Sequence, residues 1–244
     1  MYHLVIVLII GAITHFLQSS WKEKSAHSGY NKAMTEKEQR IETLREEAHD
    51  CQGCGLWETR TNVVFGEGNP NSPLVLIGEG PGETEDKTGR PFVGRAGQLL
   101  DECLYACGIT RKHIFITNVV RCRPTLVGET GRLQNRPPTA DEASACVSGW
   151  LEPILGTVQP LVILCLGGPS ASMVIKRGFK ITSERGQFFE SRYAPYAIAA
   201  LHPAYILRQE GAAYDHAREL LIADIEATRK KVVEAKKEPP RTLF

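Results

Sequence analysis

The chain has 244 residues, of which 42% are hydrophobic and 23% are charged, and its formal net charge is +1. This composition is ordinary for a soluble globular protein with a sizeable core, and it excludes a disordered or low-complexity chain. A net charge so close to zero excludes a general attraction to nucleic acid, so any such contact needs a local basic patch. One patch is predicted in the loop region that carries Arg121, Arg123, Arg132 and Arg136.

The N-terminal segment is apolar from residue 4 to residue 13, and a second short apolar stretch ends at residue 17. A membrane-spanning helix needs about 20 apolar residues. A signal peptide needs a basic start and a small-residue cleavage site, and neither is evident in this segment. We interpret it as an extension without a catalytic role, and association of residues 4–17 with a membrane is the less favoured alternative. A cytoplasmic location is therefore expected.

A polar, charge-alternating segment follows, in which a helix is predicted from about Thr35. These changes in composition divide the chain into an extension (residues 1–34), one globular domain (residues 35–231) and a basic tail (residues 232–244). The tail is expected to be a solvated helix end that becomes disordered.

Apolar runs alternate with amphipathic stretches from residue 50 onward. Each run is short and rich in aliphatic residues, which is typical of strands buried on both faces of a parallel sheet. The predicted strands are 74–78, 114–119, 161–167 and 196–201, and the predicted helices are 95–107, 139–155, 169–177 and 214–231. The second helix opens with Thr139 and Glu142, the spacing of a capping box. This alternation predicts an α/β fold of three layers (α/β/α) with a central four-stranded, mainly parallel sheet.

The stretch 78-GEGPGETEDKTGRPFVGRAGQLL-100 follows the first predicted strand and is rich in glycine and acidic residues. It matches neither of the common glycine-rich phosphate-binding patterns, and its carboxylates would repel a phosphate. A loop with carboxylates and little side-chain bulk instead suits acid–base chemistry on a small, mostly neutral group.

Polar side chains follow three of the predicted strands. Glu79 comes after the first strand, Asn118 lies at the end of the second, and His202 follows the fourth, while Gly167 and Gly168 follow the third. Ligand sites of open α/β sheets lie beyond the carboxyl ends of the strands. A carboxylate, a carboxamide and an imidazole are therefore expected at one edge of the sheet.

Seven cysteines are present, and Cys51 and Cys54 form a CxxC motif in a glycine-containing loop. Cys122 and Cys146 would complete a four-cysteine site with this motif. Four thiolates suit zinc and a [4Fe–4S] cluster equally well, whereas a disulfide framework is disfavoured in a chain of this size. The remaining cysteines, expected to pack as small hydrophobic residues, are Cys103, Cys107 and Cys165.

Taken together, these motifs resemble the iron–sulfur uracil-DNA glycosylases, family 4 of the uracil-DNA glycosylase superfamily. The resemblance covers about residues 48–230, and each of its motifs is short. The motifs are 51-CQGC-54, the loop 78–100, 117-TNVVRCRP-124, Cys146 and 202-HPAYILR-208. The resemblance implies a base-excision repair enzyme that hydrolyses the N-glycosidic bond of deoxyuridine, releases uracil and leaves an abasic site. It also implies a [4Fe–4S] cluster on Cys51, Cys54, Cys122 and Cys146.

The resemblance also implies roles for single residues. Glu79 is expected to activate or stabilise the attacking water, with Asp86 as the alternative acid. His202 is expected to stabilise negative charge on the departing uracil. The residues expected to bind the flipped base, or to fill the gap that it leaves in the stack, are Gly80, Phe92, Asn118 and Ile206.

The expected partner is uracil-containing DNA, single- or double-stranded, with water as the only cosubstrate and the protein as a monomer. The residues expected to face the DNA backbone are Arg121, Arg123, Arg136 and Arg208. A structural salt bridge is the alternative role for Arg208.

Two features depart from the family's pattern. Gly82 follows Pro81, so no bulky ring at this position can exclude the methyl group of thymine. Residues 125–135 resemble an insertion, at the place where a relative that is trapped covalently on uracil-DNA carries a nucleophilic histidine. This insertion contains no histidine, which favours turnover over trapping.

Two other classes of function are weighed against the enzyme. A non-catalytic iron–sulfur module that binds DNA within a replication complex would not need Glu79, Asn118 and His202 together. An esterase or nucleotide hydrolase on a similar sheet is disfavoured because the chain lacks a GxSxG motif and a cluster of metal-ligating His and Asp residues.

Overall fold

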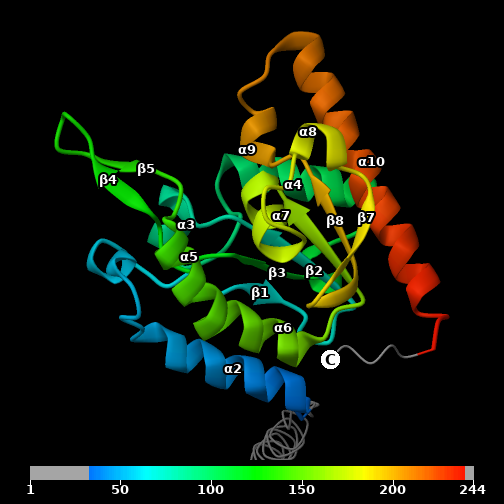
Figure 1. Ribbon diagram of the computed structural model, residues 1–244, viewed down its shortest axis with the longest axis horizontal. Coiled ribbons are helices and arrows are strands. Elements are labelled where there is room, and N and C mark those ends of the chain that lie inside the picture. Colours follow the sequence, from blue (N-terminus) through cyan, green and yellow to red (C-terminus); the bar gives the residue numbers. More distant parts are fainter. Residues whose placement is uncertain (1–32, 240–244) are drawn as a thin grey trace, which may run out of the picture. The chain divides into compact units, whose positions relative to one another are not determined.

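The computed structural model describes residues 33–239, which form a mixed α/β domain around one main sheet (Figure 1). The order of its strands is β1-β3-β2-β6-β8-β7. Its centre consists of the four predicted strands, which pair in parallel: β2 (Leu74–Gly78), β3 (Phe115–Asn118), β6 (Val162–Leu166) and β8 (Ala194–Ala200). The prediction of an α/β fold with a mainly parallel central sheet is therefore confirmed.

The predicted number of four strands is wrong, because the sheet has six. Strand β1 (Glu67–Gly68) pairs antiparallel with β3, and β7 (Phe188–Ser191) pairs antiparallel with β8. Both lie at the edges of the sheet and are only partly buried. Edge strands lack the continuous apolar run that marks a strand buried on both faces, so the pattern used for the prediction does not detect them.

Alternate side chains of each central strand enter two separate hydrophobic clusters. Val75 and Ile77 of β2 belong to the cluster on one face, whereas Leu74 and Leu76 belong to the cluster on the other. Period-two alternation explains this division, since successive side chains of a strand point to opposite faces. The sheet therefore needs helices on both of its faces.

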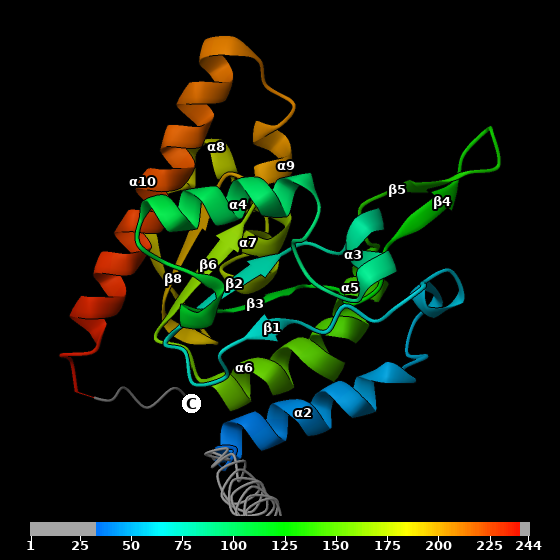
Figure 2. The same cartoon turned by 180° about the vertical axis from the view of Figure 1, so that it is seen from behind.

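Helices cover each face, as Figures 1 and 2 show from opposite sides. The helices that contribute to the cluster of Val75 and Ile77 are α2 (Glu36–His49), α5 (Ala140–Cys146), α6 (Glu152–Val158) and α7 (Gly168–Val174). Those that contribute to the cluster of Leu74 and Leu76 are α4 (Arg95–Ala106), α9 (Pro203–Ile206) and α10 (Gly211–Ala235). The domain thus has three layers.

Some boundaries differ from the predicted ones. The predicted helix 139–155 starts with both capping-box hydrogen bonds at Thr139, but a π-helical turn, η3 (Val147–Leu151), separates α5 from α6. Helix α10 continues to Ala235 with Val232 buried, so residues 232–235 are helical and do not belong to a disordered tail.

The remaining elements are short. Strands β4 (Thr125–Val127) and β5 (Leu133–Asn135) form an antiparallel hairpin that extends away from the sheet in Figure 1 and corresponds to the predicted insertion. The short helices are η1 (Gly55–Glu58), α3 (Glu83–Thr88), η2 (Arg111–His113) and α8 (Ile181–Glu184).

Within residues 33–239, none of the helices combines the length and the apolar character needed to cross a membrane. The apolar segment 4–17, for which membrane association is the less favoured prediction, lies outside the described residues.

Candidate active site and cysteine site

A cavity of about 420 Å³ lies beyond the carboxyl ends of β2 and β3. Its volume falls within the range of ordinary ligand pockets. The predicted site residues that line it are Glu79, Gly80, Phe92, Asn118 and His202. Residues from three distant parts of the chain reach one pocket because ligand sites of open α/β sheets lie beyond the carboxyl ends of the strands.

Glu79 lies directly after β2 and is partly buried. Its backbone carbonyl accepts a hydrogen bond of 3.0 Å from Val120 N. Within the described residues, no hydrogen bond or ion pair engages its carboxylate, and burial raises its pKa. The backbone of Glu79 is thus fixed beside β3, and its carboxylate is available to accept a proton from a molecule in the cavity.

Asn118 ends β3 and lies beside Gly78 of β2. A Cβ atom at Gly78 would come within 2.4 Å of both Asn118 Oδ1 and the Phe92 ring. Glycine at this position therefore allows the amide and the aromatic ring to approach each other across the end of the strand. The Asn118 amide makes no side-chain hydrogen bond in the part of the chain that the structure describes, so both its donor and its acceptor are available to a ligand.

Phe92 adopts a backbone conformation that is unusual for a residue with a side chain, with φ at 53°. Arg111 donates hydrogen bonds to the carbonyls of Pro91, at 2.9 Å, and of Phe92. Gly97 also permits this conformation, since a Cβ there would lie 1.7 Å from Phe92 O. The Phe92 ring lies 6.0 Å from the ring of His202, with an angle of 32° between the planes.

Glu85 and Arg111 are residues of the site that sequence reasoning missed. Glu85 Oε1 accepts hydrogen bonds from Val93 N at 2.9 Å and Gly94 N at 2.8 Å, so that it fixes the loop between Phe92 and the start of α4. No sequence signal separates Glu85 from the other acids of the same loop, because its role depends on a contact that forms only in the fold.

His202 is the N-cap residue of α9. Its Nδ1 accepts a hydrogen bond of 3.0 Å from Ala204 N, which leaves Nε2 to carry the proton of the neutral ring. Burial, aided by the charge of Arg208, lowers the pKa of His202 to about 4. At neutral pH the imidazole is therefore uncharged and can donate a hydrogen bond from Nε2.

Asp86, the alternative catalytic acid, does not line the cavity. It is only 3% exposed, and its Oδ1 accepts a hydrogen bond of 2.9 Å from Thr61 N. Its backbone carbonyl accepts a further bond of 2.8 Å from the Asn62 side chain. This corrects the prediction for Asp86, because its carboxylate ties α3 to the loop of Thr61 and is not available to substrate.

Ile206, expected to fill the gap left by a flipped base, is 0% exposed and packs in the core with α10. This corrects the prediction, since a buried side chain cannot enter a DNA stack. The neighbouring residue Tyr205 is 44% exposed and belongs to the same short helix.

The predicted DNA-facing arginines differ widely in exposure. Arg121 is only 1% exposed, which corrects the expectation that its side chain faces a phosphate. Arg123 is buried and donates to Asn135 Oδ1 at 2.6 Å, and Arg136 pairs with both carboxylate oxygens of Glu142 at 2.7 and 2.6 Å. Arg208 is exposed.

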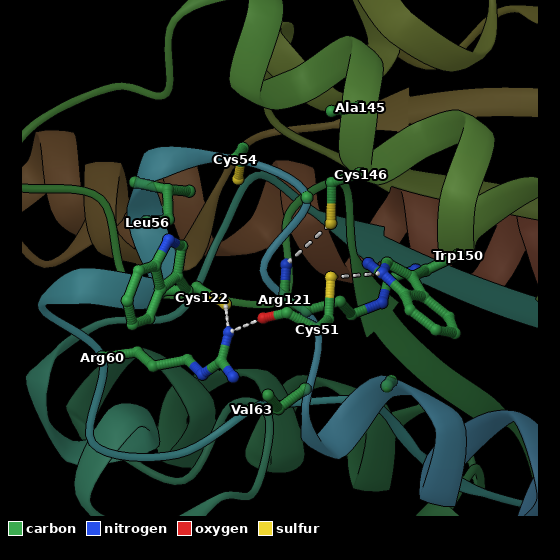
Figure 3. A pocket seen from close by; sticks show the side chains of 13 residues that line it. Cys51, Cys54, Leu56, Arg60, Val63, Arg121, Cys122, Ala145, Cys146 and Trp150 are labelled. Carbon is green, nitrogen blue, oxygen red and sulfur yellow. Dashed lines mark hydrogen bonds between the residues drawn. The ribbon is translucent and has the colours of Figure 1, made fainter.

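The four cysteines of the predicted metal site line one cavity, and in Figure 3 their sulfur atoms surround a common space. Cys51 and Cys54 come from the loop between α2 and η1, Cys122 follows β3, and Cys146 ends α5. The fold thus brings together three segments that lie far apart in the sequence.

Nitrogen donors point at three of the four sulfur atoms. Trp150 Nε1 donates to Cys51 Sγ at 3.2 Å, Arg121 N to Cys146 Sγ at 3.3 Å, and Arg60 Nη1 to Cys122 Sγ at 3.6 Å (Figure 3). Such donors stabilise thiolates that bind a metal or a cluster. Burial raises the pKa of Cys122 to about 11, so a metal must displace its proton on binding.

The cavity of the four cysteines adjoins a buried cation, which suits an anionic group such as the implied cluster. Among residues 33–239, no three His, Cys, Asp or Glu side chains lie close enough together to hold one metal ion. The buried Arg121 guanidinium also fits an anionic group, since Nε and Nη2 have no hydrogen-bond partner in the described part of the chain. The other cysteines, Cys103, Cys107 and Cys165, are buried in the two hydrophobic clusters.

Comparison with known proteins places the chain among DNA-repair glycosylases. Residues 65–226 match the model of the uracil DNA glycosylase superfamily. The Type-4 uracil-DNA glycosylase of Thermotoga maritima is 40% identical over 197 residues, which cover 80% of this chain and 96% of that protein. The Type-4 uracil-DNA glycosylase of Archaeoglobus fulgidus is 35% identical, with 84% of this chain and 97% of that protein covered. The chain therefore belongs to the uracil DNA glycosylase superfamily, within its type-4 family.

Proposed function

We propose that this protein hydrolyses the N-glycosidic bond of deoxyuridine in DNA, releases uracil and leaves an abasic site. The observation that carries the proposal is one cavity that holds an unpaired carboxylate, an unpaired carboxamide and a neutral histidine. Membership of the family and the Type-4 uracil-DNA glycosylase relatives support it. A non-catalytic DNA-binding module is not favoured, because binding alone gives no reason to keep these groups unpaired in a pocket.

Two groups perform the bond cleavage. As the C1′–N bond breaks, positive charge develops on the sugar and negative charge on the uracil. Glu79 orients the attacking water and accepts its proton, and its carboxylate also stabilises the charge on the sugar. His202 donates a hydrogen bond from Nε2 to the uracil oxygen on which negative charge accumulates, an interaction that strengthens in the transition state.

Two further groups select the base. The Asn118 amide can donate to one position of the uracil edge and accept from the next, a pattern that cytosine reverses. The Phe92 ring can stack on the extruded base, because its loop is fixed by Glu85 and Arg111. Gly80 lines the same cavity without a side chain that would occupy the space of the base.

We propose further that Cys51, Cys54, Cys122 and Cys146 hold a [4Fe–4S] cluster. The three N–H donors at the sulfur atoms and the buried Arg121 cation support this assignment. When bound, the cluster supplies a rigid cross-link between the loop after α2, the segment after β3 and the end of α5. Glycosidic cleavage itself requires only the residues of the cavity.

The expected substrate is uracil-containing DNA, with water as cosubstrate. Arg208 is proposed to contact phosphate, since it is exposed and follows the His202 loop. Arg123 and Arg136 are proposed to order the rim of the cavity, because both are paired within the protein. The monomeric state, the cytoplasmic location and the start of the domain at residue 35 stay predictions.

The proposal is tested with an end-labelled oligonucleotide that contains one uracil. After incubation with the protein, alkali should break the strand at that position. The matched oligonucleotide with thymine at the same position should remain intact. An intact uracil strand, at a protein concentration above that of the DNA, would contradict the proposed activity.

A further inference from the structure

The Arg121 guanidinium is a buried cation that forms no ion pair with any of the described residues. The side chain is 1% exposed, and Nη1 donates to the backbone carbonyl of Asn118. Its Nε and Nη2 find no acceptor within residues 33–239, and none of the ion pairs in this part of the chain includes Arg121. Burial of an unpaired charge is strongly unfavourable, so native proteins pair such groups or bind an ion beside them.

Within residues 33–239, the groups whose negative charge can act on this guanidinium are the Cys146 and Cys122 thiolates of the cysteine site. Arg121 lines that cavity and precedes Cys122 in the chain, and its backbone N donates to Cys146 Sγ at 3.3 Å. Four thiolates around a four-iron cluster leave the whole group with a net negative charge. A buried cation at this place is therefore accounted for if the anionic group is present.

The same residue is linked to the proposed base pocket through Asn118. Asn118, whose carbonyl accepts from Arg121 Nη1, presents its amide to the cavity that holds Glu79. The segment between them is also tied to β2 and the loop after it, because Val119 N donates to Gly78 O at 2.8 Å and Val120 N to Glu79 O at 3.0 Å. Residues 118–121 thus connect the cysteine site to two of the residues proposed to act on the substrate, Glu79 and Asn118.

We propose that Arg121 is a positioning residue that neutralises the cluster and, through its bond to the Asn118 carbonyl, makes the geometry of the uracil pocket depend on the cluster. This inference rests on the proposed cluster. The cluster then has a function in an enzyme whose bond-breaking step needs no metal. If the anionic cluster is lost, Arg121 is left buried without a counter-charge. Segment 118–121 must then rearrange so that the Arg121 guanidinium can reach solvent.

The test compares Arg121→Met, which removes the charge, with Arg121→Lys, which keeps it. Arg229→Met is the control, because it removes the same charge from a surface pair with Glu226 on α10, on the opposite face of the sheet from α5. The readouts are the midpoint reduction potential of the cluster, the rate of iron release to a chelator and the single-turnover rate of uracil release.

For Arg121→Met, the midpoint potential should shift to a more negative value, because loss of a nearby positive charge disfavours reduction. Iron release should become roughly 10- to 100-fold faster, the usual effect of losing a group that supports metal ligands. Arg121→Lys should keep the potential near that of the unchanged protein. Its uracil release should still slow by about tenfold, because a lysine cannot reproduce the guanidinium geometry that holds Asn118.

The outcomes separate the two proposals. If the protein without substitutions contains no iron, the proposal of a cluster is wrong, and this result does not depend on the role of Arg121. A cluster that is present, with the same potential and the same iron release in Arg121→Met as in Arg229→Met, would overturn the role of Arg121. If Arg121→Met does not fold, Arg121→Lys decides alone: normal uracil release would show that the guanidinium does not position Asn118.

Discussion

The base pocket and the cysteine site lie at the two ends of segment 118–122, yet they differ in how far the protein itself provides hydrogen-bond partners for their polar atoms. In the pocket, the Glu79 carboxylate and the Asn118 amide have no side-chain partner among the described residues, and His202 uses only one of its two ring nitrogens. In the cysteine site, N–H donors engage three of the four sulfur atoms. Polar groups without a partner in the protein suit a substrate that enters and leaves the pocket. Cysteine sulfur atoms that accept hydrogen bonds suit a group that stays bound.

The largest effect is expected from Glu79→Gln. The substitution keeps the size of the side chain but removes the base, so single-turnover release of uracil should fall by about 10²–10⁴-fold. Stability should be unchanged or slightly higher, because Glu79 has no ion pair to lose and burial already disfavours its charge. Rapid-quench kinetics and a thermal melt on the same sample would measure both. A rate near that of the unchanged protein would break the assignment of Glu79.

His202→Ala comes next, with an expected loss of about 10²–10³-fold in the single-turnover rate. Since the pKa of His202 is lowered to about 4, the ring is neutral at higher pH and its contribution should be constant from pH 6 to pH 8. Rates measured over that range for the protein and the variant should therefore run parallel. A ratio between them that changes across this range would show that a charged histidine acts.

Trp150→Phe tests the other region. It keeps an aromatic ring, although a smaller one, and removes the N–H that donates to Cys51 Sγ, so iron release to a chelator should become about tenfold faster. The single-turnover rate of freshly prepared protein should stay within twofold, a margin of about 0.4 kcal/mol, because Trp150 does not line the base cavity. Equal chelation rates would show that this hydrogen bond does not support the site.

Asp86→Asn should have the smallest effect, and on stability alone. The substitution exchanges a charge-assisted hydrogen bond to Thr61 N for a neutral one, so the free energy of unfolding should fall by about 1 kcal/mol. The rate of uracil release should not change. Denaturant unfolding and single-turnover kinetics should thus give opposite results for Asp86→Asn and Glu79→Gln.

Much of this organisation could be predicted from the sequence, because it follows from local patterns. The four central strands have continuous apolar runs, and the strand-end rule brings Glu79, Asn118 and His202 to one edge. The edge strands β1 and β7 were missed because partly exposed strands have no such run.

The errors concern which side of a short element faces the cavity. Glu79 and Asp86 lie in one acid-rich loop, and only the course of α3 decides that Asp86 is buried against Thr61. Ile206 and Tyr205 are neighbours on a single helical turn. The Ile206 side chain is buried in the core, whereas the Tyr205 side chain, one position earlier, is exposed to solvent. The sequence suggests Arg121 as a DNA contact because a basic loop has the same composition whether its side chains face solvent or are buried.

The pH dependence of single-turnover uracil release tests the central claim most directly, which is that a buried, unpaired Glu79 carboxylate is the base. Burial raises the pKa of Glu79, and the base must be deprotonated to act. The rate should therefore be full at neutral pH and fall as the pH drops through a pKa above the usual range of a glutamate. Glu79→Gln should remove this acid limb and Asp86→Asn should leave it unchanged. An acid limb that persists in Glu79→Gln would contradict the account.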